Sequence, residues 1–344
     1  MLKTIDFSKA SARSIVMKSA LRVPRQVLIE AVVCTTLLSP LMGDVSRPLQ
    51  QLKADPVRAA IHPDDWKSFT AALRQRSVRF QGSVGYVVKD LRSGEIVAIN
   101  QDRVFPSASL IKLPILVAAY QAVEDGRASL SQPITLHRRD RRGGSGILKW
   151  AMPGTIFTLR ELLEYMIIHS DNTAAEMVIQ RLGFDYLRHT FDRLGLQDTE
   201  IHPDGFRLTG RRVAEDNRTS PRDMAYLLEK IYHGGLVSRD ASEDMLRILK
   251  HQKLRDRLPR FLPTGWQIAH KTGLLRRACH DVGIVFSPQG DYLICVLTSH
   301  QATYKNAKRF IASLGRITYD YYQGGFHRPM LQSRRDAPAA QPAS

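Results

Sequence analysis

The chain has 344 residues, enough to bury a full hydrophobic core, and its hydrophobic and charged fractions of 43% and 24% are those of an ordinary globular protein. Its formal net charge is +17, but no zinc-finger, RNP-type or basic-zipper pattern occurs, so we expect no nucleic-acid partner. Two interpretations of the charge remain open: a diffusely basic surface, or attraction to an anionic envelope surface or an acidic wall polymer.

The N-terminal part carries an apolar run at residues 27–42, preceded by Lys18, Arg22 and Arg25. With a start at Met17 the segment would be similar to a secretory signal peptide. Glu30 interrupts the run, no Ala-x-Ala site follows, and the run is short for a membrane span. We therefore expect residues 1–75 to be an N-terminal segment that holds a signal or anchor and a linker.

Two strands are predicted at 84–89 and 95–100, and a helix follows at 109–123. Helical segments then dominate to about residue 252. The signals for them are a capping box at Thr158 and Glu161, stops at Gly183 and Gly195, and Ser220 ahead of a proline. Three further strands are predicted at 266–271, 281–286 and 292–299, with a closing helix at 304–322.

This grouping of elements predicts an α/β sandwich, in which helices flank one antiparallel five-stranded sheet. A helical subdomain at about 124–255 would be inserted within a domain of residues 76–324, and the site would lie in the cleft between the two parts. The last residues, 325–344, are rich in Pro, Ala and Arg, and we expect them to be disordered.

The three cysteines, Cys34, Cys279 and Cys295, are too few for a disulfide framework. No CxxC or His/Cys spacing indicates a metal, and we expect no metal and no cofactor. Cys279 and Cys295 lie in or beside predicted neighbouring strands. If these strands pair across the turn at 288–290, the two cysteines are several residues out of register. We therefore expect two buried free thiols there.

The most informative stretch is Ser109-Leu110-Ile111-Lys112, which places a hydroxyl and an amine nearly one helical turn apart. A lysine that loses its charge in a dry cleft can take the proton of a serine and make it a nucleophile. Alone, the pattern is also compatible with an N-cap serine and a solvated lysine. Two later tripeptides strengthen it, each of which occurs once: Ser170-Asp171-Asn172 and Lys271-Thr272-Gly273.

With these motifs in this order, the chain resembles the penicillin-recognising serine hydrolases, which include class A β-lactamases and related D,D-peptidases. The resemblance runs from about residue 82 to about residue 323. It includes the lead-in 105–108 and the segment 162–183, and the segment 270–283 is most similar to β-lactamase-like serine hydrolases. The resemblance implies a β-lactamase/transpeptidase-like fold. It also favours export to the periplasm or the outside, with a cytoplasmic location if the apolar run is not a signal.

The resemblance implies that Ser109 is the acylated nucleophile and that Lys112 is its base or part of its proton relay. Ser170 would relay a proton toward the leaving nitrogen, and Asn172 would bind the acyl-side amide of the substrate. Asp171 is expected to point away and fix the loop, although an ordinary turn and helix cap would give the same tripeptide.

The third motif begins at the last residue of the strand predicted at 266–271, and the resemblance gives its residues roles in substrate binding. Lys271 would add positive potential, and Thr272 would bind the substrate carboxylate. Gly273 would let the substrate lie against an edge strand. The backbone N–H groups of Ser109 and Leu274 would form the oxyanion hole.

His280 follows Lys271 by nine residues. Many class A enzymes place an arginine at this spacing, and it holds the substrate carboxylate. Here His280, Arg276 or Arg277 could do so, while the alternative is a histidine bonded only to nearby backbone.

One departure concerns deacylation. Class A β-lactamases carry a Glu-x-x-Leu-Asn pattern whose glutamate activates the deacylating water, and residues 200–221 contain no such pattern. Asp204 is the nearest carboxylate at a family-like distance from Pro221, and Glu215 is the second candidate. Without a placed base we expect slow deacylation.

Three functions remain open. The first is a serine hydrolase that cleaves a β-lactam or a related amide or ester, and the second is a D-Ala-D-Ala peptidase that acts on peptidoglycan. The third is a low-turnover, penicillin-acylated sensor or wall-binding module. The expected partner is a small-molecule or peptidoglycan-derived substrate, and we expect a monomer.

Overall fold

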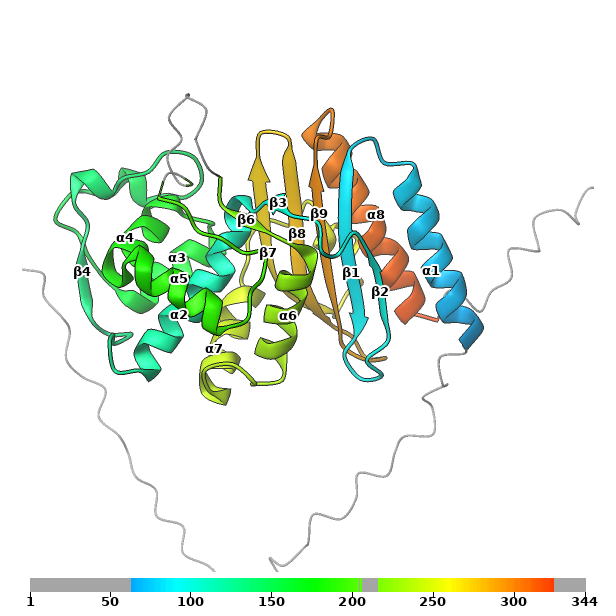
Figure 1. Cartoon of the computed structure of the whole chain (residues 1–344), viewed down its shortest axis with the longest axis horizontal. Coiled ribbons are helices and arrows are strands. Elements are labelled where there is room, and N and C mark those ends of the chain that lie inside the picture. Colours follow the sequence, from blue (N-terminus) through cyan, green and yellow to red (C-terminus); the bar gives the residue numbers. More distant parts are fainter. Residues whose placement is uncertain (1–62, 204, 206–215, 325–344) are drawn as a thin grey trace, which may run out of the picture. The chain divides into compact units, whose positions relative to one another are not determined.

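The computed structural model describes residues 63–203, 205 and 216–324. Its centre is a five-stranded antiparallel sheet with the strand order β2-β1-β9-β8-β7 (Figure 1). β7 and β2 therefore form the two edges of the sheet. The strands are β1 (Ser83–Asp90), β2 (Ile96–Ile99), β7 (Gln267–Leu275), β8 (Ala278–Phe286) and β9 (Tyr292–Ser299).

Both faces of the sheet are covered, which explains why its central strands are mostly apolar and buried on both sides. Along β9, Ile294 and Val296 belong to one hydrophobic core, and Leu293, Cys295 and Leu297 belong to a second core on the other face. The first core is closed by α1 (Pro63–Val78) and α8 (Tyr304–Tyr322), which pack on each other. The second core is closed by α6 (Pro221–Tyr232), α7 (Arg239–Lys250) and the helical part of the chain.

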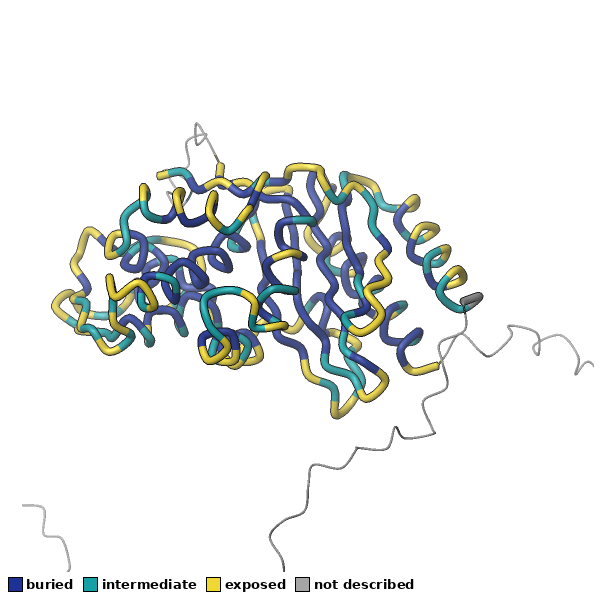
Figure 2. Tube along the Cα trace, turned by 60° about the horizontal axis from the view of Figure 1, so that its bottom comes forward, coloured by how far each residue is buried: buried dark blue, intermediate teal, exposed yellow. Residues whose placement is uncertain are grey.

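The helical part lies beside the β7 edge and is built around α2 (Lys112–Glu124), which is apolar on all sides and buried along most of its length. Around it pack α3 (Leu159–Ile168), α4 (Asn172–Leu182) and α5 (Phe184–Arg193). The tube coloured by burial shows this central helix in dark blue within more exposed neighbours (Figure 2).

Short elements complete the described chain. Two two-stranded sheets pair β3 (Phe105–Pro106) with β6 (Arg218–Thr219) and β4 (Pro133–Thr135) with β5 (Ile156–Thr158). The 3-10 helices are η1 (Ala108–Ile111), η2 (Arg138–Asp140), η3 (Leu148–Trp150) and η4 (Leu258–Phe261). No helix in the described ranges is both long and apolar enough to cross a membrane.

The predicted fold class is confirmed: an antiparallel five-stranded sheet, helices on both faces and a helical subdomain. The closing helix has the predicted bounds, and the capping box at Thr158 and Glu161 starts α3 as expected. α1 was not predicted, and it spans the position of the boundary expected between residues 75 and 76.

The thiols of Cys279 and Cys295 are free and buried, as expected, because their register partners are Thr298 and Val282. Cys34, the apolar run and the C-terminal tail lie outside the described residues.

Candidate active site

The segment that carries Ser109 is a tight turn, and buried residues on either side of it in the sequence hold it in place. η1 leads directly into α2, and the fully buried Leu110 and Ile111 anchor it in the core. Ala108, just ahead of the serine, has a φ of 49°, which is uncommon for a residue with a side chain. The backbone N–H of Ser107 donates to the Asn217 carbonyl at 2.7 Å. The turn therefore holds Ser109 half-buried at the start of the helix.

Lys112 is fully buried and points at the Ser170 loop. Its Nζ donates to the Ser170 carbonyl at 2.6 Å and to Asn172 Oδ1 at 2.6 Å, and it lies 3.5 Å from Ser170 Oγ. Burial lowers the pKa of Lys112 to about 7, and the charge of Asp171 opposes part of that shift. A substantial fraction of this amine is therefore neutral near pH 7 and able to accept a proton.

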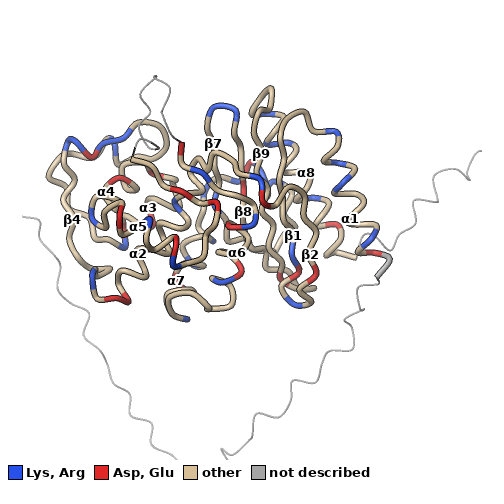
Figure 3. The backbone as a smooth tube through the Cα atoms, viewed as in Figure 1, with Lys and Arg blue, Asp and Glu red and all other residues tan. Residues whose placement is uncertain are grey.

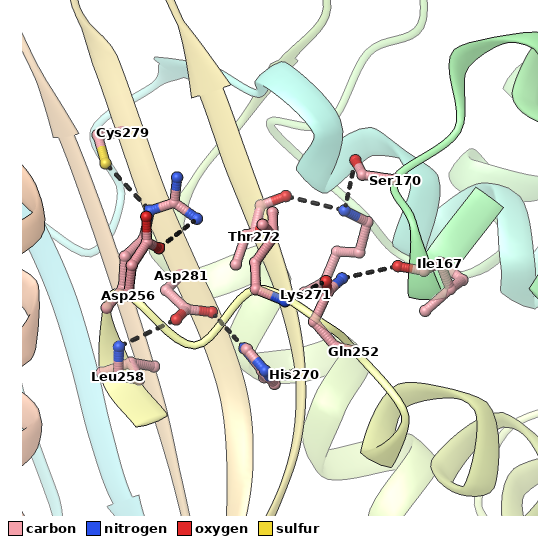
Figure 4. Close-up of polar contacts among 12 residues, drawn as sticks. Ile167, Ser170, Gln252, Asp256, Leu258, His270, Lys271, Thr272, Cys279 and Asp281 are labelled. Atoms are coloured by element: carbon pink, nitrogen blue, oxygen red, sulfur yellow. Dashed lines mark hydrogen bonds and ion pairs between the residues drawn. The ribbon is translucent and has the colours of Figure 1, made fainter. Parts of the chain in front are cut away.

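Lys271 reaches the same hydroxyl from the sheet. Its Nζ donates to Ser170 Oγ at 3.0 Å and to the Thr272 carbonyl at 2.9 Å (Figure 4). Burial is the main cause that places the pKa of Lys271 well below its usual value, and the nearby charge of Lys112 adds to the effect. Ser170 therefore lies between two buried amines, an arrangement suited to passing a proton between them.

Asp171 turns away from these amines and organises the loop, as expected. Its carboxylate accepts hydrogen bonds from the backbone N–H groups of Ala174, Ile147 and Leu148 at 2.6 to 2.9 Å. The first of these bonds caps α4, and the other two tie the segment before η3 to the catalytic loop. A side chain at Gly146 would collide with Asp171, so this close packing requires glycine.

The β7 edge lies directly against the nucleophile turn. A Cβ added to Gly273 would lie 3.2 Å from Ala108 Cβ and 3.2 Å from the Ser107 carbonyl oxygen. Alternation along the strand puts Lys271 and Gly273 on this face. Thr272 lies between them on the edge strand, is buried and has Asp281 as its register partner. Leu274 is exposed at the end of the edge.

His280 is fully buried under the nucleophile turn and does not open into the cleft. Its Nε2 is 2.7 Å from the Pro106 carbonyl oxygen, and its Nδ1 accepts the Thr298 N–H at 3.2 Å. Burial lowers its pKa to about 4, so the ring is neutral near pH 7. Because both ring nitrogens are engaged by backbone, His280 has no free donor for a substrate carboxylate in this structure, which corrects that expectation in favour of the backbone-bonded alternative.

Behind β7 lies a group of buried charges that the sequence reasoning missed (Figure 4). Asp281 is fully buried and accepts from His270 Nδ1 at 2.9 Å and from the Leu258 N–H at 3.1 Å. Arg257 is 1% exposed, and its Nε donates to Cys279 Sγ at 3.3 Å. The signal that could have found them is a charged residue, Asp281, inside an otherwise apolar strand.

The structure thus brings together Ser109, Lys112, Ser170, Asn172, Lys271 and Gly273 around one loop and one strand edge. Asp204 and Glu215, the deacylation candidates, lie outside the described residues. Within the described ranges, no group of three or more His, Cys, Asp or Glu side chains could hold a metal ion.

Comparison with known proteins gives a consistent result. The model of a family described as the beta-lactamase enzyme family matches residues 68–322. Beta-lactamase VEB-1 from Pseudomonas aeruginosa is 24% identical over 260 residues, which are 70% of this chain and 85% of that protein. Extended-spectrum beta-lactamase PER-1 from the same organism is 25% identical over 256 residues, 70% of this chain and 83% of that protein.

Solved structures are similar over most of the described chain. A beta-lactamase from Sphaerobacter thermophilus DSM 20745 has a TM-score of 0.69 and 28% identity, and the match covers 75% of this chain and 98% of that chain. PBP-A has a TM-score of 0.69 and 32% identity, and the match covers 75% of this chain and 96% of that chain. A point mutant of PBP-A, 31% identical to this chain, has been solved as an acyl-enzyme complex with penicillin G.

Proposed function

The chain belongs to the beta-lactamase enzyme family, and on that basis we propose that it is a serine hydrolase that forms an acyl-enzyme through Ser109 with a β-lactam or a related amide or ester. One observation carries the proposal. The amine one helical turn after Ser109 is fully buried, has a pKa of about 7 and is held by Ser170 and Asn172. A lysine with no catalytic role would normally remain solvated and charged.

In the proposed acylation step, neutral Lys112 takes the proton of Ser109 as the serine oxygen bonds to the substrate carbonyl carbon. The backbone N–H groups of Ser109 and Leu274 stabilise the oxyanion. The proton passes through the Ser170 hydroxyl to the leaving nitrogen, whose bond to the carbonyl carbon then breaks. Lys271, bonded to the same hydroxyl, stabilises the charge that develops during this transfer.

We propose that deacylation is slow. The stretch 200–221 carries no Glu-x-x-Leu-Asn element, and Asp171, the carboxylate nearest in sequence to the catalytic serines, is committed to three backbone N–H groups. Ser109, Lys112, Ser170 and Lys271 supply the groups for acylation, whereas the sequence of this stretch lacks the glutamate pattern that activates water for the second step. This supports a second candidate, a penicillin-acylated protein with little turnover.

The test is time-resolved intact mass spectrometry after addition of benzylpenicillin. We expect one adduct per chain, mapped to Ser109, that persists for minutes or longer. A Ser109→Ala protein that still acquires the adduct would rule out this nucleophile. Rapid loss of the adduct would show efficient β-lactamase turnover, and Asp204→Asn and Glu215→Gln would then be compared for adduct lifetime. Release of D-alanine from a D-Ala-D-Ala peptide would single out a peptidase.

A further inference from the structure

Large apolar side chains gather on one short stretch of the surface, around η3 and the start of β5. Trp150 and Met152 are 79% and 77% exposed, and Ile147 and Ile156 are more than half exposed. These four, the apolar patch, are a third of the twelve large apolar side chains that are exposed in the described ranges. A single exposed apolar side chain is ordinary, whereas a cluster of them marks a surface that a partner covers.

The backbone holds the first part of the apolar patch outward. The Asp171 carboxylate accepts the N–H groups of Ile147 and Leu148 at 2.6 and 2.8 Å, and Leu148 is buried. The Trp150 N–H donates to the Ile147 carbonyl at 3.0 Å, and residues three apart in a 3-10 turn lie on the same side. The exposure of Ile147 and Trp150 is therefore fixed by the fold and by the loop that carries Asp171.

The second part of the apolar patch is held beside a basic stretch of the chain. The Gly154 N–H, two residues after Met152, donates to the Leu136 carbonyl at 2.8 Å. The Leu136 N–H in turn donates to the Thr155 carbonyl at 2.8 Å. Residues 137–142 follow directly, so this stretch begins next to the turn that carries Met152.

This stretch places positive charge at the edge of the apolar patch. Arg138 and Arg139 are exposed, and the side chain of Arg138 has no ion pair or hydrogen bond within the described part of the chain. The one acidic residue between 137 and 157 is Asp140, which is 2% exposed and lies 3.8 Å from Arg139 Nε. Figure 3 shows the stretch at the upper left, beyond β4, as blue positions on both sides of a single red one.

Lys149 joins the charged and the apolar surfaces. Its Nζ lies 5.5 Å from the centre of the Trp150 ring and donates to the Gly144 carbonyl. A cation beside an exposed indole suits the boundary between lipid headgroups and acyl chains, where tryptophan and basic side chains gather.

We propose that the apolar patch and its basic border, which consists of Arg138, Arg139 and Lys149, dock on a lipid bilayer that carries anionic headgroups. Trp150 and Met152 then enter the headgroup region, while the basic border contacts lipid phosphates. Charge complementarity favours this partner. A soluble polyanion or wall polymer would neutralise the arginines but leave the apolar patch in water, and a second copy of the chain would bring like charges together.

The apolar patch adjoins the candidate active site. The Asn172 N–H donates to the Ser145 carbonyl at 3.1 Å, and Asp171 holds the N–H of Ile147. Docking would therefore hold the catalytic loop close to the bilayer surface. The inference goes beyond the proposed function and does not depend on it, because binding to lipid can be measured without acylation.

The test is co-sedimentation of the full chain with vesicles of phosphatidylcholine alone or mixed with about one third phosphatidylglycerol. We expect binding to the mixed vesicles, with a partition coefficient that declines as NaCl rises from about 0.05 to about 0.5 M. Trp150→Ser/Met152→Ser should lower this coefficient by about tenfold or more, because less apolar area enters the bilayer. Arg138→Ser/Arg139→Ser should lower it by about tenfold to thirtyfold, or about fivefold for each charge.

Two double variants on the far side of the sheet serve as matched controls. Val78→Ser/Tyr304→Ser removes two exposed apolar side chains, one from α1 and one from α8. Lys305→Ser/Arg309→Ser removes two exposed cations of α8. Both controls should bind like the unaltered protein. Because every comparison uses the full chain, any contribution of residues 1–62 is common to all variants.

Lipids with brominated acyl chains give a second readout, since they quench only tryptophan that reaches the bilayer. They should quench part of the tryptophan emission of the unaltered protein. Trp150→Phe, which retains an aromatic ring, should lose most of this quenching.

The inference is overturned if mixed vesicles bind no protein, if Trp150→Phe is quenched equally, or if the far-side controls bind as weakly as the variants of the apolar patch and its basic border. If only the arginine variant loses binding and soluble polyphosphate competes fully, the surface is a polyanion site instead. A dimer that Trp150→Ser/Met152→Ser abolishes, without any binding to vesicles, would assign the surface to a second copy of the chain.

Discussion

The buried amine of Lys112 makes a quantitative prediction about the pH dependence of acylation. Burial lowers the pKa of this group to about 7, and only the neutral amine can take a proton from Ser109. With this pKa, roughly one tenth of the amine is neutral at pH 6 and roughly nine tenths at pH 8. The acylation rate constant should therefore rise about tenfold between pH 6 and pH 8, with its midpoint near pH 7.

The measurement is the second-order rate constant for acylation by benzylpenicillin, followed by stopped-flow or quenched intact mass between about pH 5.5 and pH 9. Lys112→Ala should lower it by about a hundredfold or more across this range, as expected for loss of a general base. Lys305→Ala removes an exposed lysine of α8 and should leave the profile unchanged. A profile that is flat or falls with pH, or a Lys112→Ala protein that acylates near the original rate, would refute the assignment of Lys112 as the base.

Four further predictions follow from named contacts. Burial lowers the pKa of His280 to about 4 in the folded protein, from 6.5 in the unfolded chain. Its contribution to the free energy of unfolding is therefore full above pH 6.5, and about 3 kcal/mol is lost as the pH falls to 4. Denaturant titrations of His280→Gln should show a smaller loss. Thr272→Val should lower kcat/KM about tenfold for carboxylate-bearing substrates and less for neutral esters, and equal losses would assign the strand a scaffold role. Gly273→Ala should slow acylation, by about tenfold in the same rate measurement, because its methyl group would lie 2.9 Å from His280 Cδ2 and 3.2 Å from Ala108 Cβ and would displace the nucleophile turn from β7. Cys279 and Cys295 should stay unmodified by a thiol reagent in the native protein and react after unfolding, as read by peptide mass mapping.

The parts of the fold that the sequence could predict are those in which local pattern and burial agree. α8 was predicted with its bounds, since its apolar positions recur at helical spacing, and β9 was predicted from a continuous apolar run that is buried on both faces. α1 was missed because little in its own sequence marks a buried face. It is held in place by tertiary contacts, among them the stacking of Phe69 on Tyr321 with ring centroids 4.4 Å apart.

In the site, the motifs identified the residue types but could not give their electrostatic state. The spacing from Ser109 to Lys112 predicts that the two share a helix face, whereas the lowered pKa of Lys112 depends on burial beneath a loop 58 residues away. The two interpretations of His280, a carboxylate ligand or a backbone-bonded ring, could not be separated either. The decision rests on Pro106, from the segment ahead of the nucleophile, and on Thr298 in β9.

The buried charges behind β7 were not predicted, because the residues that carry them lie far apart in the sequence. Arg257 and Asp281 are separated by a loop and a whole strand, and only Asp281, a charge in a mostly apolar strand, stands out in its local sequence. Their effects on Lys271 have opposite directions, because Asp281 raises the pKa of that amine and Arg257 lowers it. Since the two contributions oppose each other, the pKa of Lys271 is governed mainly by its burial and by the charge of Lys112. The protein can thus place a carboxylate and a guanidinium close behind the catalytic strand while burial and the charge of Lys112 lower the pKa of Lys271.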